Sequence, residues 1–214
     1  MKNLKKALIA GTCSVLLVAG SVAGTMAYLT STDTVTNTFT VGNVAITLDE
    51  AKANTDGSLV EGADRVQANS YKLLPGHTYA KDPMVTVLND SEESYVRMTV
   101  TLSKSAELDA IFTGEANMLE IFNGYDSTNW LYKGNVEDAT ANTRTYEFWY
   151  KETVSAADGN VALDALFDSI TVPGEITNEQ LATINDMTIT VNAEAIQADG
   201  FETADAAWAA FPAN

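Results

Sequence analysis

Residues able to carry out catalysis are few in this sequence. It contains one histidine, His77, beside the turn-forming pair Pro75–Gly76, and one cysteine, Cys13. A catalytic zinc site usually needs two histidines one helical turn apart with a glutamate as base, and no HExxH motif occurs. A Ser-His-Asp triad would also depend on His77, yet no serine lies in a Gly-x-Ser-x-Gly turn. The sequence therefore predicts no catalytic residue and no cofactor, and it places His77 in a turn or on the surface.

Clusters of acidic side chains are the other candidate sites. There are three of them: Asp49 with Glu50, Asp90 with Glu92 and Glu93, and Asp199 with Glu202. Calcium requires several convergent oxygens, and none of these stretches has the spacing of an EF-hand loop. Solvated turns explain the clusters better than calcium sites do, so the sequence predicts no metal site.

The N-terminal segment, residues 1–27, has the pattern of a secretory signal peptide. Three lysines lie among the first six residues, and residues 7–22 carry no charge. Thr25 and Ala27 are the small side chains that a signal peptidase accepts before the bond it cuts, so cleavage is expected to leave Tyr28 as the first residue. The alternative is a retained transmembrane anchor, but glycine and serine dilute an apolar stretch that is already short for a span.

The mature chain is strongly acidic and lacks cysteine. The net charge is −17, and removal of residues 1–27, which hold three lysines and no acid, makes it −20. Such a chain is repelled by nucleic acid and by anionic lipid, so we expect no nucleic-acid partner and no stable membrane insertion after cleavage. Because Cys13 is removed with the signal, disulfides and thiolate chemistry are excluded from the mature protein.

Alternation of apolar and polar side chains with a period of two recurs along the chain and is typical of strands with one buried face. The apolar sets are Val96, Met98, Val100 and Leu102; Tyr146, Phe148 and Tyr150; and Met187, Ile189, Val191, Ala193 and Ala195. Near the start, the parity changes from that of Val35, Phe39 and Val41 to that of Val44, Ile46 and Leu48. The change falls at Gly42–Asn43, where a bulge or bend re-aims the chain.

Turn signals arrange these strands into hairpins. Residues 49–70 are polar and irregular, which indicates a long surface loop. We expect one hairpin between strands at 84–88 and 95–103, and a second between 130–136 and 144–151. The pattern of Val172–Pro173–Gly174 indicates a further turn.

Short helices are expected in the connections. They are residues 106–112 with Ser105 as cap, residues 178–184 with a capping box of Thr177 and Gln180, and the Ala-rich tail 203–211. Six to nine short strands with two or three such helices predict an all-β fold, an antiparallel β-sandwich. We find no internal repeat or linker, so residues 42–214 are predicted to form one domain.

Aromatic residues gather in the second hairpin. Tyr146, Phe148 and Tyr150 share one parity, which favours the core, whereas Trp149 has the other. An exposed aromatic strip can bind carbohydrate or a protein partner. The parity of Trp149 is compatible with that role and with a position in the core.

The segment between the signal and the domain, residues 28–41, is named the arm. It is rich in Thr and Val, holds no Pro or Gly and carries one charge, Asp33. Its β-propensity is high, but it has too few apolar residues to fold alone. Addition of the arm to an exposed sheet edge would satisfy its backbone hydrogen-bonding groups, and Val35, Phe39 and Val41 would fill pockets. The alternative is that the arm pairs within its own subunit.

Two blocks of sequence carry a family resemblance: GTMAYLTSTDTVTNTFTVGNVAITLDE and LLPGHTYAKDPMVTVLNDSEESYVRMTV. They resemble the TasA/camelysin family of secreted Gram-positive proteins, and the C-terminal AEAIQADGFETADAAWAAF is similar to the tails of its members. The likeness is good over 1–103 and 187–211 and loose between.

The resemblance implies export through a dedicated signal peptidase of the SipW type and a jelly-roll sandwich. It also implies assembly into extracellular biofilm matrix fibres, in which the arm of one subunit adds a strand to the next. On this basis we expect a secreted structural subunit at the cell surface or in the matrix, partnered by copies of itself and by other matrix proteins. The alternatives are a monomeric accessory protein that binds a partner through a sandwich face and, third, the metalloprotease activity described for camelysin relatives.

Overall fold

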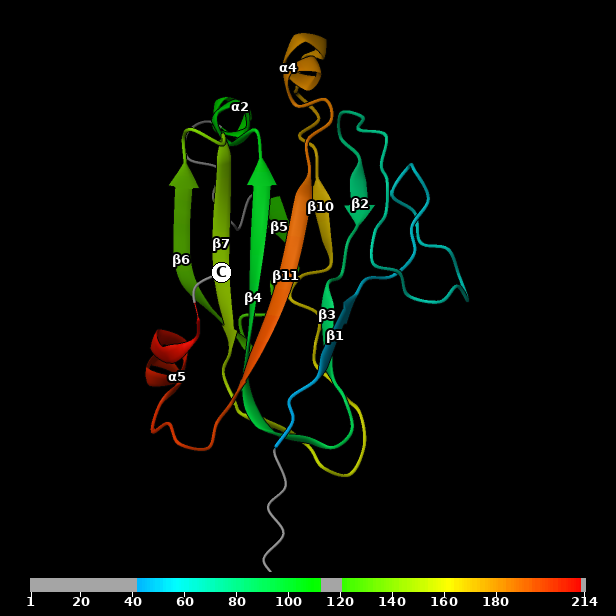
Figure 1. Ribbon diagram of the computed structural model, residues 1–214. Helices are drawn as coiled ribbons and strands as arrows, with labels where there is room; N and C mark the ends of the chain where they lie inside the picture. The colour runs from blue at the N-terminus through cyan, green and yellow to red at the C-terminus, as the bar shows by residue number, and fades with distance from the viewer. Residues whose placement is uncertain (1–41, 113–120, 213–214) are drawn as a thin grey trace, which may run out of the picture. The chain divides into compact units, whose positions relative to one another are not determined.

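The computed structural model describes residues 42–112 and 121–212 (Figure 1). The contacts divide the chain into two units, Met1–Val41 and Gly42–Asn214, and the described residues all belong to the second. This unit is an all-β, jelly-roll-like antiparallel sandwich with three short helices in its described connections, as the sequence predicted. Across those two ranges, no helix has the length and apolar character needed to cross a bilayer.

The larger layer is one sheet in the order β11-β4-β7-β6, with β8 also paired to β4. The bounds are β4 Ser91–Ser103, β6 Trp130–Asp138, β7 Thr143–Tyr150, β8 Val154–Ala156 and β11 Ile189–Gln197. The pairs are antiparallel, and β4 lies between β7 and β11 for most of its length. Since β11 pairs only with β4 in the described part of the chain, it is one edge of this sheet.

The opposite layer consists of two three-stranded sheets, in the orders β1-β3-β9 and β2-β10-β5 (Figure 1). The bounds are β1 Ile46–Asp49, β2 Thr78–Ala80, β3 Met84–Val87, β5 Phe122–Asn123, β9 Val161–Ala162 and β10 Ser169–Thr171. Among the described residues β1 pairs only with β3, so β1 is an edge as well. The long loop after β1 is confirmed, with only isolated bridges such as Glu50 to Val66.

The core lies between the two layers and follows the predicted parity. On β4 the inward side chains of Val96, Met98 and Val100 are fully buried, and Tyr146 and Phe148 are fully buried on β7. The facing layer contributes a second set to the same cluster, namely Tyr79, Val85, Val87, Phe122 and Ile170. Burial of these side chains, at about 1.5–3 kcal/mol each, is the main stabilising contribution in a chain without disulfides.

One predicted hairpin is confirmed and the other is wrong. Strands β6 and β7 pair as expected, with a register shift between Tyr132 and Gly134. Strand β3 does not pair with β4, because β3 lies in the opposite layer between β1 and β9. The turn at Asn89–Asp90, where Asp90 has a φ of 65°, carries the chain from one layer to the other.

The helices are α2 Ser105–Ile111, α4 Asn178–Thr183 and α5 Ala204–Ala210. The capping box of Thr177 and Gln180 is confirmed. Ser105 is not the cap of α2: the N-cap is Lys104, with φ 59° and no side-chain cap bond. The amide oxygen of Asn142, from the β6–β7 turn, accepts from the Ala106 N–H at 3.0 Å instead. A residue distant in sequence therefore satisfies this helix end.

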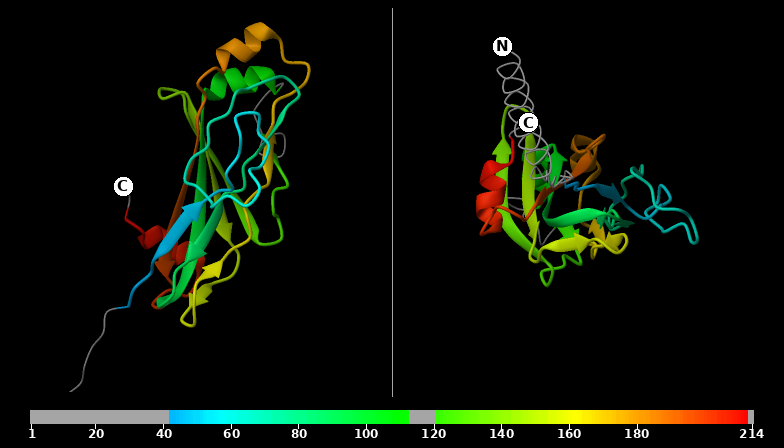
Figure 2. Two further views of the ribbon diagram at one scale, coloured as in Figure 1. Left: turned by 90° about the vertical axis from the view of Figure 1, so that its right-hand side faces the viewer. Right: turned by 60° about the horizontal axis from the view of Figure 1, so that its bottom comes forward.

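Helix α5 lies over the outer face of the larger sheet and covers Trp149 (Figure 2). Trp149 is 9% exposed, and its ring centroid lies 6.1 Å from that of Trp208 on α5. The Arg97 guanidinium stacks on Trp208 at 4.4 Å, and the Lys133 ammonium stacks on Trp149 at 3.9 Å. The contact of Arg97 with Trp208 fixes the helix to the sheet, so Trp149 belongs to a second, smaller packed cluster and not to an exposed aromatic strip.

Candidate functional site

The residues predicted to act in export and assembly precede the described part of the chain. The cleavage residues Thr25, Ala27 and Tyr28 and the arm residues Val35, Phe39 and Val41 all lie outside the described ranges. The described residues begin at Gly42, so the structure contains only the surface against which an arm could pack.

One groove lies near the edge strands β1 and β11. It has a volume of about 1460 Å³ and is lined by residues of β1, the first residues of β11, helix α4 and the loop of residues 67–73. Ligand pockets for small molecules measure about 300–1,000 Å³. The groove is larger than that and is lined by residues of two strands, so a length of polypeptide is its candidate occupant.

The walls of the groove combine polar side chains with partly exposed residues of the core. Inward side chains on the central strand β4 are at most 1% exposed, whereas Ile46 and Leu48 on β1 and Ile189 and Val191 on β11 are only half-buried. All four pack against the main core cluster, together with Tyr71, Leu73, Leu181 and Met187. Among the described residues, the hydrophobic core is thus partly exposed along this seam.

The backbone beside the seam is only partly free to pair, because the N–H and C=O of Glu50, directly after β1, are both bonded to Val66. An edge strand directs half of its N–H and C=O groups away from its neighbour, and natural proteins usually cover or charge such edges. Within the described residues β11 has partners only on β4 over its nine residues, and β1 only on β3. Only residues 189–191 of β11 line the groove, so it offers a short stretch of free backbone at each edge in addition to apolar side chains.

A buried ion pair interrupts the apolar wall. The Lys81 ammonium lies 2.5 Å from Glu50 Oε2, and the two residues are 7% and 5% exposed. The Asn69 side chain donates to Glu50 Oε1 at 3.0 Å. Burial and the nearby Glu50 carboxylate raise the pKa of Tyr71, whose hydroxyl donates to the Ala80 carbonyl at 2.6 Å. The centre of the groove is therefore polar and firmly positioned.

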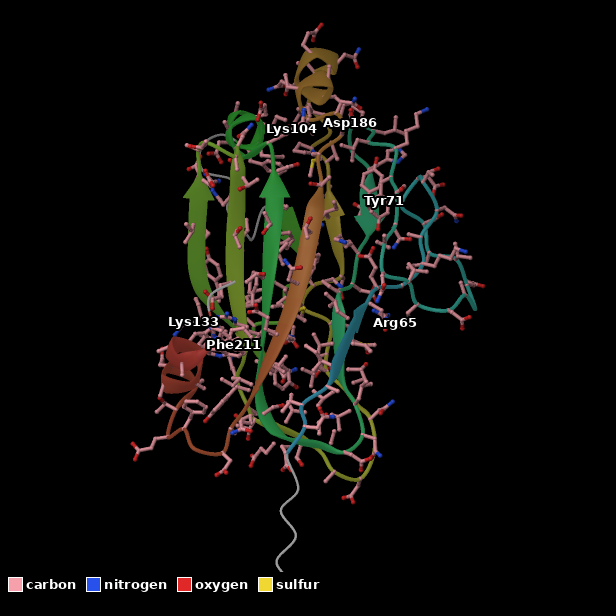
Figure 3. All side chains as sticks on the ribbon, viewed as in Figure 1. Arg65, Tyr71, Lys104, Lys133, Asp186 and Phe211 are labelled. Carbon is pink, nitrogen blue, oxygen red and sulfur yellow. The ribbon has the colours of Figure 1, made fainter. Side chains whose placement is uncertain are left out.

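Arg65 holds the loop that forms this wall. Its guanidinium pairs with the carboxylates of Asp49 and Asp82, the latter at 2.9 Å, and also donates to the Asp82 carbonyl at 2.8 Å. Figure 3 shows Arg65 and Tyr71 on the same side of the groove, with Asp186 near its upper end. A single cation thus ties the long loop to the end of β1 and the start of β3.

The other candidates from the sequence do not assemble into a site in the structure. His77 follows the Pro75–Gly76 turn and is exposed, with its ring 6.3 Å from that of Tyr79. Asp49 and Glu50 are engaged by Arg65 and Lys81, and Glu93 accepts from the Thr153 hydroxyl. In the ranges the structure covers, no three His, Cys, Asp or Glu side chains converge as metal ligands would.

Sequence reasoning did not identify the residues of the groove. The half-buried status of Ile46 and Val191 depends on which strands are edges, and this is set by long-range pairing. A lysine such as Lys81, placed between the core residues Tyr79 and Pro83 at a period of two, was a signal that could have been noticed. Its partner Glu50 lies 31 residues away and has no local signature.

Comparisons with known proteins identified no relative of this chain. No family model, no curated protein and no solved structure gave a significant match to the chain. The resemblance to the TasA/camelysin family stays a prediction, and the function has to be argued from the geometry of the groove.

Proposed function

We propose that the protein is a secreted structural subunit of an extracellular matrix fibre, in which the arm of one subunit occupies the groove of the next. The observation that carries the proposal is the seam near β1 and β11, where half-buried core residues lie beside two edge strands. The arm has a complementary composition: residues 34–41 carry no charge, have high β-propensity and include the apolar Val35, Phe39 and Val41.

Binding of the arm requires both burial of its apolar side chains and hydrogen bonds from its main chain. Full burial of Val35, Phe39 and Val41 contributes about 1.5–3 kcal/mol each. Association costs about 4–15 kcal/mol in translational and rotational freedom, so the anchors alone roughly balance it. Hydrogen bonds to the free edges of β1 and β11 supply the remaining stabilisation. The groove therefore favours a strand over an isolated apolar side chain.

The path of the chain favours insertion into a neighbour. The Glu92 N–H donates to the Asn43 carbonyl at 2.8 Å, and the Leu88 N–H donates to the Ala45 carbonyl at 2.8 Å. These bonds hold the start of the domain extended beside residues 88–92. To enter its own groove, the arm would have to reverse direction before Gly42 and use its last residues in the turn. Insertion in trans leaves Phe39 and Val41 available as anchors.

The orientation of the strands gives a polar fibre. In Figure 1 the chain enters β1 from below and ascends, while β11 descends from α4. An arm that extends the larger sheet antiparallel to β11 ascends through the groove, and its C-terminal end then leaves at the top. That end continues into the bottom of the next domain. The contact is heterologous and does not close, which produces filaments instead of dimers.

Three mature proteins beginning at Tyr28 test the proposal: the intact chain, Phe39→Asp and the control Thr38→Asp. Phe39→Asp puts a charge into an apolar pocket and should leave monomers, whereas Thr38→Asp adds the same charge on the opposite side of the strand. Light scattering and negative-stain microscopy measure the outcome. Raised ionic strength should promote fibres of the intact chain by screening its negative charge.

Persistent monomers of the intact chain across salt and pH would contradict the fibre role and leave the monomeric accessory protein. Equal loss of fibres in Phe39→Asp and Thr38→Asp would show that charge, and not insertion into the groove, controls assembly.

A further inference from the structure

A lysine, a glutamate and an asparagine meet directly after β1. The Lys81 ammonium lies 2.5 Å from Glu50 Oε2, and the Asn69 side-chain NH₂ donates to Glu50 Oε1 at 3.0 Å. Lys81 and Glu50 are 7% and 5% exposed. The amine and the amide are therefore neighbours on the two oxygens of one buried carboxylate. A lysine amine is a nucleophile and a carboxylate accepts protons, so these groups can form an amide cross-link.

The Asn69 side chain is held in one orientation by three hydrogen bonds. Besides Glu50, its NH₂ donates to the Ala51 carbonyl at 2.9 Å, and its Oδ1 accepts from the Ala53 N–H at 2.9 Å. These partners decide which end of the amide is oxygen, because carbonyl and carboxylate oxygens accept and an N–H donates. The Ala53 N–H also lies where it would stabilise negative charge on Oδ1 if the amide carbon became tetrahedral.

Main-chain hydrogen bonds hold the other two members of the cluster. The N–H and C=O of Glu50 exchange bonds of 2.8 Å with Val66, and the Lys81 N–H donates to the Asp168 carbonyl at 3.0 Å. Well-oriented intramolecular groups reach effective concentrations of about 10⁵–10⁸ M. A reaction of an amine with an amide, which is very slow between separate molecules in water, is therefore favoured at this place.

We propose that Lys81 and Asn69 become joined by an amide bond between their side chains, with Glu50 as the catalytic residue. Glu50 takes a proton from the Lys81 ammonium, and Nζ attacks Cγ of Asn69. The Nζ–Cγ bond forms and the Cγ–Nδ2 bond breaks. Of the two protons that Nζ gives up, one reaches Nδ2, which leaves as ammonia, and the other stays on Glu50. The step needs no oxidant and does not depend on the proposed function.

The product is favoured because it contains no buried ion. Desolvation makes a buried ion pair costly, and the reaction replaces the ammonium and the carboxylate with a neutral amide and a carboxylic acid. Burial also keeps out water, which would otherwise convert Asn69 to aspartate. The newly folded chain holds the ion pair, and the bond forms from it. Because the bond closes a short loop, it stabilises less than a link between distant residues would.

Mass spectrometry of the mature chain after prolonged incubation tests the proposal. The intact chain should be lighter than its sequence by one ammonia. Trypsin should release residues 66–72 joined to residues 73–97, because it does not cut after a lysine whose side chain is an amide. A chain of full mass, with separate peptides that end at Lys72 and Lys81, would overturn the proposal.

Lys81→Arg is the matched variant. It keeps a cation beside Glu50, but a guanidinium stays charged and is no nucleophile, so the variant should keep its full mass. It also excludes a second route, since Asn69 precedes Ser70 and can lose ammonia by closing on its own backbone as a succinimide. Loss of ammonia that persists in Lys81→Arg would assign the change to that ring and overturn the cross-link.

Glu50→Gln tests the catalytic residue, because it keeps the shape of the side chain and removes the proton acceptor. It should keep its full mass although Lys81 and Asn69 are both present, whereas Lys72→Arg, at an exposed site, should lose ammonia as the intact chain does. Cross-linking of Glu50→Gln at the rate of the intact chain would overturn the role of Glu50. The melting temperature checks the folding of each chain, and Lys81→Arg still decides the bond if Glu50→Gln does not fold.

Discussion

Lys81→Met is the most informative single substitution for the stability of the domain. It removes the cation and keeps the length of the side chain, which leaves the Glu50 carboxylate at 5% exposure with the Asn69 amide as a donor. Removal of one partner from a buried pair costs about 3–5 kcal/mol. In a domain of this size each kcal/mol lowers the melting temperature by about 2–4 °C. The expected decrease is therefore roughly 6–20 °C.

The assay is thermal unfolding followed by circular dichroism on the mature chain in its monomeric form at low salt. Lys52→Met is the control, because Lys52 is exposed and its loss should change stability by less than about 0.5 kcal/mol. The double variant Lys81→Met with Glu50→Leu should recover most of the loss, since an apolar pair of similar volume is often neutral or stabilising. If the single and double variants unfold at the same temperature, an uncompensated Glu50 is not the cause. If Lys81→Met behaves like Lys52→Met, the pair is solvated and the description of the groove centre is wrong.

Three further predictions concern parity, chemistry and processing. Val100→Asp should prevent folding by placing a charge among fully buried residues, whereas Thr99→Asp on the other face of β4 should be tolerated; equal soluble yields and melting curves would refute the assigned faces. His77→Ala should leave secretion and folding unchanged because the side chain is exposed, and a chelator-sensitive proteolysis that disappears in this variant would support the metalloprotease alternative. N-terminal sequencing of secreted protein should give Tyr28, and a full-length form recovered from membranes would indicate a retained anchor.

Strands with a strict period of two could be predicted from the sequence, because successive side chains alternate between the buried and the exposed face of a sheet. The central β4 and the β6–β7 hairpin are of this kind, as is the capping box at Thr177, where all partners lie within three residues. The fold class followed from these elements alone.

Features that depend on distant partners could not be predicted. Strands of two or three residues such as β5 and β9 are too short to show a period, and they exist because a neighbour supplies their hydrogen bonds. The predicted β3–β4 hairpin was wrong because the turn at Asn89–Asp90 is compatible with a change of layer as well as with a reversal. The covering of Trp149 by α5 and the pairing of Lys81 with Glu50 similarly join segments far apart in sequence.

The docking of α5 has a practical consequence for imaging. The helix ends beside Phe211, whose ring lies 5.1 Å from Arg97, on the outer face of the larger sheet (Figure 3). The groove lies at the β1 and β11 edges, away from this helix. In the proposed assembly, a fluorescent protein or affinity handle fused after the C-terminus would therefore extend from the outer face of the larger sheet and leave the contacts between subunits free. The same fusion at the start of the mature chain would have to pass through every such contact.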